Sequence, residues 1–82
     1  MRMQTEDRKN MILSAAIRVA NGPKMLAGVT HGAVSKQCVI LTSQRTVRRY
    51  FPQQRDLWLA VHASDKEAFE DQAIALGIIA AK

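Results

Sequence analysis

The segment from Thr42 to Phe51 constrains the fold of this chain most, because its residues suit one structure, a short amphipathic helix. Ser43 can cap that helix by accepting a hydrogen bond from a first-turn amide. Val47 and Phe51 are four residues apart and therefore share one face, which we expect to point into a core. Pro52 ends the helix, since the residue before a proline is disfavoured in helical geometry.

Apolar residues recur at helical spacing along the rest of the chain. Aromatic residues are few, so aliphatic side chains and alanine must supply nearly all of the core, which favours packed helices over a sheet. We therefore predict an all-α fold, a small bundle of four to five helices that contains a helix-turn-helix. Besides 43–51, the expected helices cover about 5–20, 31–39, 53–62 and 64–79, the last opened by a capping-box pattern from Ser64 to Glu67.

Charge is distributed unevenly over the 82 residues, which carry 12 basic and 7 acidic side chains and a net charge of +5. Ten of the basic and three of the acidic residues precede position 63, whereas the last twenty residues carry a net charge of −2. A polyanion is expected to meet the first three quarters of the chain and to avoid the tail. An ordinary solvated basic surface is the alternative interpretation.

The predicted helix over 43–51 is basic on its outer side and about two and a half turns long, which suits insertion into a DNA major groove about 12 Å wide. We expect its polar residues to read base edges or to contact phosphates, because arginine suits guanine and glutamine suits adenine. The predicted base-contacting residues are Gln44, Arg45, Thr46 and Arg49. The predicted backbone contacts are Thr30, Ser43, Arg48, Tyr50 and Arg55.

The order of these patterns resembles the DNA-binding domain of the tetracycline-repressor (TetR) family over roughly Arg8 to Val61. Thr30 matches the threonine that opens the family's second helix, the segment 43–51 follows its recognition helix, and Phe51 to Leu57 follows the segment after it. The resemblance implies a helix-turn-helix protein that binds duplex DNA and regulates transcription.

Three features differ from the family pattern. Arg48 stands where the family usually has a tyrosine, and Gln54 stands where it usually has a phosphate-binding lysine, a contact that Arg55 could take over. The turn over 39–42 is about two residues longer and lacks the usual glycine. Family members also continue into a large ligand-binding domain, whereas one helix follows here, so no small-molecule effector is expected.

The last predicted helix carries an apolar stripe that includes Phe69, Ala73, Leu76 and Ile78. Helix-turn-helix proteins usually bind two half-sites about 34 Å apart as dimers, and this stripe is a candidate dimer interface. It could equally dock on another protein, which would make the chain an interaction module or an antagonist of a regulator, or pack on the chain's own core. We accordingly assign residues 1–62 to a DNA-binding domain and 63–82 to a dimerisation or docking element.

Other classes of function find little support in the residues. His31 and His62 are far apart in sequence, and neither is paired with Cys38 at ligand spacing, so we expect no metal site, no cofactor and no enzyme activity. Cys38 is the single cysteine, which suits a reducing cytoplasm, and no apolar run is long enough to span a membrane. We predict a cytoplasmic protein that binds double-stranded DNA as a homodimer.

Overall fold

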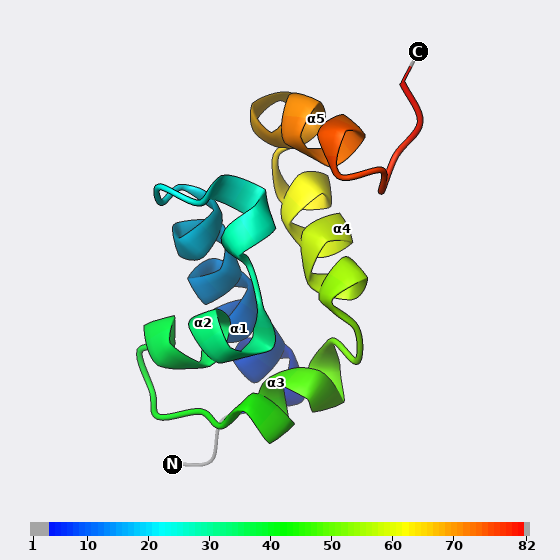
Figure 1. The fold of residues 1–82 in the computed structure, drawn as a ribbon. Coiled ribbons are helices and arrows are strands. Elements are labelled where there is room, and N and C mark those ends of the chain that lie inside the picture. The colour runs from blue at the N-terminus through cyan, green and yellow to red at the C-terminus, as the bar shows by residue number, and fades with distance from the viewer. Residues whose placement is uncertain (1–3, 82) are drawn as a thin grey trace.

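The computed structural model describes residues 4–81, so Met1 to Met3 and Lys82 lie outside it. Within this range the chain is all-helical and has no strand, which confirms the predicted fold class (Figure 1). None of the helices within residues 4–81 is long and apolar enough to cross a membrane. The elements are α1 (Thr5–Ala20), the short 3-10 helix η1 (Met25–Gly28), α2 (His31–Gln37), α3 (Gln44–Tyr50), α4 (Gln54–Ser64) and α5 (Lys66–Ala75).

Helix α1 is the centre of the bundle and packs against α2, α4 and η1. Ile12, Ala16 and Ala20 are buried at intervals of four residues, so one stripe of α1 faces the core. Small alanines on this stripe let the neighbouring helices approach closely. The described core has fourteen members: Ile12, Ala15, Ala16, Ala20, Leu26, Val29, Val34, Val47, Phe51, Leu57, Val61, Phe69, Ala73 and Ile78.

Two predicted caps open the helices of the helix-turn-helix. The Thr30 hydroxyl accepts a hydrogen bond from the amide of Ala33 at 3.1 Å, and the Ser43 hydroxyl accepts one from the amide of Thr46 at 3.2 Å. Each cap satisfies an amide that has no partner inside its helix. Helix α2 ends at Gln37, two residues earlier than predicted, because the backbone of Cys38 is already extended.

The junction between α4 and α5 differs from the prediction. Asp65, not Ser64, caps α5, since its carboxylate accepts a hydrogen bond from the amide of Ala68 at 3.2 Å. The Ser64 hydroxyl instead donates to the carbonyl of Val61 at 2.6 Å, within the last turn of α4. Helix α4 therefore runs two residues beyond its predicted end at His62.

Helix α5 ends at Ala75, four residues before its predicted end. Gly77 has a φ of 75°, and its amide donates to the carbonyl of Ile74, while the amide of Ile78 donates to the carbonyl of Ala73. This pair of bonds is a Schellman motif, which needs a left-handed residue that glycine adopts without strain. The motif turns the chain so that Ile78, 6% exposed, packs back into the core.

We expect Gly77→Ala to lower the free energy of unfolding by about 1 kcal/mol, because a β-carbon disfavours the left-handed conformation. An added β-carbon at this position would meet no atom within 4 Å, so backbone strain alone determines the effect. Urea unfolding followed by circular dichroism measures the change. Gly77→Asn is the matched control and should lose less stability, since asparagine tolerates this conformation; an unchanged alanine variant would contradict the prediction.

The apolar stripe of α5, which the sequence offered as a candidate dimer or partner interface, lies in the chain's own core. Phe69 is 3% exposed, Ala73 is fully buried and Ile78 joins them, while Leu76 is partly buried against the same cluster. The stripe covers α4 and η1, which are the neighbours of α5. Burial against its own chain was the third of the alternatives that the sequence left open.

Candidate nucleic-acid interface

Helix α3 presents two arginines directly away from the core. Val47 is fully buried and fixes which face of α3 points inward. Each residue turns an α-helix by about 100°, so the positions two before and two after Val47 lie on nearly the opposite side. Arg45 and Arg49 occupy these positions and are exposed. The two guanidinium groups therefore stand on adjacent turns of the outer face.

The other polar residues of α3 differ in their surroundings. Gln44 packs beside α2, since its Nε2 lies 3.2 Å from where a β-carbon on Gly32 would be. The Thr46 hydroxyl is 3.1 Å from the hydroxyl of Ser43, and Tyr50 is partly buried against the core. Arg48 is exposed at the flank of the helix. Of the four residues predicted to read bases, Gln44, Arg45 and Arg49 are exposed, and Thr46 is partly buried.

Two hydrogen bonds fix the orientation of α3 relative to α2. At the start of α2, the Nε2 of His31 donates to the carbonyl of Phe51 at 2.7 Å. Towards the end of α2, the hydroxyl of Ser35 donates to the carbonyl of Thr42 at 2.7 Å. One hydrogen bond therefore connects each end of α3 to α2. The sequence did not predict either contact, because the partners lie 20 and 7 residues apart and meet only once α2 and α3 have packed together.

The residues after α3 make contacts inside the protein that the sequence did not predict. The side-chain amide of Gln54 donates to the carbonyl of Val29 at 3.0 Å, and the indole of Trp58 donates to the same carbonyl at 3.2 Å. The Gln54 side chain thus joins α4 to Val29, in the segment just before α2. Arg55 is exposed and donates one hydrogen bond to the carbonyl of Ile78 at 3.4 Å.

The helices α1 and α2 beside α3 carry basic residues and few acidic ones. No aspartate or glutamate occurs from residue 8 to residue 55, a segment that includes α2, α3 and most of α1. Lys9 of α1 lies over the ring of Phe51, with its Nζ 5.7 Å from the ring centroid, which places a cation near the end of α3. Glu6 and Asp7 precede Lys9 in the first turn of α1. The acidic residues of α5 lie at the far end of the molecule from α3 (Figure 1).

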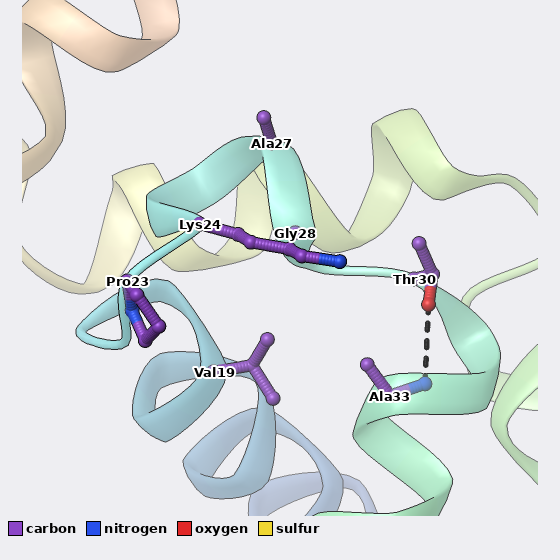
Figure 2. A pocket seen from close by; sticks show the side chains of 7 residues that line it. All are labelled: Val19, Pro23, Lys24, Ala27, Gly28, Thr30 and Ala33. Carbon is purple, nitrogen blue, oxygen red and sulfur yellow. Dashed lines mark hydrogen bonds between the residues drawn. The ribbon is translucent and has the colours of Figure 1, made fainter.

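Thr30 lies at the edge of an open hollow between α1, η1 and α2. The hollow has a volume of about 390 Å³, and its lining is mainly aliphatic. Figure 2 shows the side chain of Lys24 extending along η1 and the hydrogen bond from Ala33 to the Thr30 hydroxyl. The lining residues are Val19, Pro23, Lys24, Ala27, Gly28, Thr30 and Ala33.

The histidines take part in contacts between helices. His31 binds the end of α3, and the Nε2 of His62 lies 2.9 Å from a carboxylate oxygen of Glu70, which links α4 to α5. Cys38 is partly buried, and its thiol donates to the carbonyl of Val34 at 3.3 Å. Among residues 4–81, the structure gathers no group of three or more residues of the types that bind metals.

No protein-family model matches the chain, and neither a curated protein nor a solved structure is significantly similar to it. The likeness to the TetR family therefore stays a prediction that depends on the motifs quoted above.

Proposed function

We propose that this protein binds double-stranded DNA through α3 and regulates transcription, as a TetR-like helix-turn-helix protein of the cytoplasm. The observation that carries the proposal is the pair Arg45 and Arg49, which lies on the outer face of α3. The opposite face of the helix points into the core, because Val47 is fully buried there. Arginine presents a planar fork of donors that matches the O6 and N7 acceptors of guanine.

The dimensions of α3 suit this use. Its seven residues span about 10 Å at a rise of 1.5 Å each. An α-helix with its side chains is about 10–12 Å in diameter, which fits a major groove about 12 Å wide. We expect Arg48 and the cap residues Thr30 and Ser43, which are all exposed, to contact phosphates. Residues 8–55 contribute no carboxylate that would repel the duplex.

We further propose that two copies act together, since half-sites one helical turn apart call for a dimer. Phe69, Ala73 and Ile78 lie in the core, so contacts between the copies would use other residues of the surface. Sedimentation of the protein with a labelled duplex counts the chains in each complex. A complex with one chain per duplex at saturation would contradict the dimer.

The salt dependence of binding tests the proposed function. We expect the affinity for a duplex to fall linearly with salt on logarithmic axes, because each phosphate contact releases a counterion and contributes about −0.9 to the slope. Fluorescence anisotropy with a labelled duplex measures the slope. Lys66→Ala, which removes one charge from α5, is the control and should leave the slope unchanged. A flat slope, or no binding at low salt, would contradict the proposal.

A further inference from the structure

Three consecutive aliphatic residues are exposed in the turn between α2 and α3. Val39 is 83% exposed, Ile40 is 50% exposed and Leu41 is fully exposed. We call residues 39–41 the apolar turn. A run of three exposed apolar residues is unfavourable in a soluble domain unless it has a function. The sequence shows that these residues are apolar, and the structure adds that their side chains are exposed to solvent.

Hydrogen bonds hold the apolar turn in place at its α3 end. Thr42 is 5% exposed, its hydroxyl donates to the carbonyl of Ile40 at 2.8 Å, and its own carbonyl accepts the bond from Ser35. At the other end, Arg18 of α1 donates to the carbonyl of Gln37. Hydrogen bonds therefore flank the apolar turn on both sides.

The apolar turn leads directly into the N-terminus of α3 (Figure 1). Leu41 is two residues before the cap Ser43, a chain length of at most about 7 Å. In helix-turn-helix proteins the first residues of the recognition helix are those that contact base edges in the major groove. A helix α3 that enters the groove with its N-terminus would therefore bring the apolar turn to the same bases.

The surroundings of the apolar turn identify its partner by charge. Lys36 precedes it in α2, and Arg45 and Arg48 follow it in α3, so the turn is an apolar site within a cationic surface. Such a surface suits a polyanion, and the apolar group that a duplex presents in its major groove is the C5-methyl of thymine. Resting on the proposed function, we infer that the apolar turn packs against thymine methyl groups beside the base pairs that α3 reads.

Replacing thymine by deoxyuridine removes this methyl group and leaves base pairing intact, which gives a direct test. The probe is a duplex selected by the protein from a random pool, with each thymine replaced in turn. We expect one or two replacements to weaken binding about fourfold each, the equilibrium effect of one buried methyl-sized group. In the variant Leu41→Ser the same replacements should have no effect. Equal losses in the parent and in the variant would overturn the inference.

The control is Leu59→Ser on α4, which alters an exposed leucine away from α3 and should keep the parent's sensitivity to deoxyuridine. A selected site without thymine, or salt-dependent binding that no replacement weakens, overturns the inference but leaves the proposed function standing. Absence of duplex binding overturns both. If Leu41→Ser changes sedimentation or binding to anionic vesicles but not duplex binding, the turn serves self-association or a membrane instead.

Discussion

Replacing Phe69 with alanine should lower the free energy of unfolding by about 3–5 kcal/mol, because it leaves a cavity where the ring packs between α5 and the rest of the core. The ring is 3% exposed and belongs to the main hydrophobic cluster. A chain of 82 residues is expected to have a total stability of about 4–12 kcal/mol. The substitution therefore removes a large share of that stability, and urea unfolding followed by circular dichroism measures it.

The same substitution separates the two roles of the α5 stripe. If Phe69 served a dimer interface, its loss would shift sedimentation towards a smaller particle and leave the unfolding of the monomer unchanged. Leu59→Ala is the control, since this leucine is 36% exposed and its truncation should change stability by less than about 1 kcal/mol. A Phe69→Ala chain that unfolds like the parent would contradict the packing of α5 on its own core.

Local signals were sufficient to predict the helix-turn-helix. The caps Thr30 and Ser43 depend on amides only three residues away, and the inward face of α3 follows from the spacing of Val47 and Phe51. Pro52 marked the end of α3 by a steric effect on the residue before it. These features need no knowledge of the remaining chain, which is why the sequence was enough.

The C-terminal region was harder to predict, because its local sequence patterns are compatible with more than one structure. Ser64 and Asp65 are both good caps, and the choice between them depends on where α4 ends. Gly77 was counted inside a helix, whereas the Schellman motif uses it to return Ile78 to the core. Helical periodicity identifies an apolar face but does not say which surface covers it, so Phe69 could not be assigned to core or interface.

The candidate site was predictable to the extent that it depends on α3 alone. Arg45 and Arg49 follow from counting residues around the helix. The side-chain contacts of Gln54 and Arg55 require the fold, because their partners, Val29 and Ile78, are more than twenty residues away. The apolar turn shows the reverse case, in which a pattern visible in the sequence needed the structure to reveal that its side chains are exposed.

The variant Arg45→Ala/Arg49→Ala should lose most of its affinity for a selected duplex. Each arginine is expected to contribute about 1–3 kcal/mol, so the pair should weaken binding at least about 30-fold. Both side chains are exposed, so the variant should unfold like the parent. Anisotropy titration at one fixed salt concentration measures the affinity, and circular dichroism verifies the fold.

The matched control is Arg45→Lys/Arg49→Lys, which keeps both charges but removes the planar forks. A lysine contacts phosphate as a point charge and does not reproduce the bidentate geometry of arginine on guanine. The lysine pair should therefore keep a steep salt dependence while it loses discrimination between the selected duplex and a scrambled one. If both pairs lose affinity equally on the two duplexes, α3 contacts the backbone without reading bases. If the alanine pair binds like the parent, α3 is not the interface, and the proposed function fails with it.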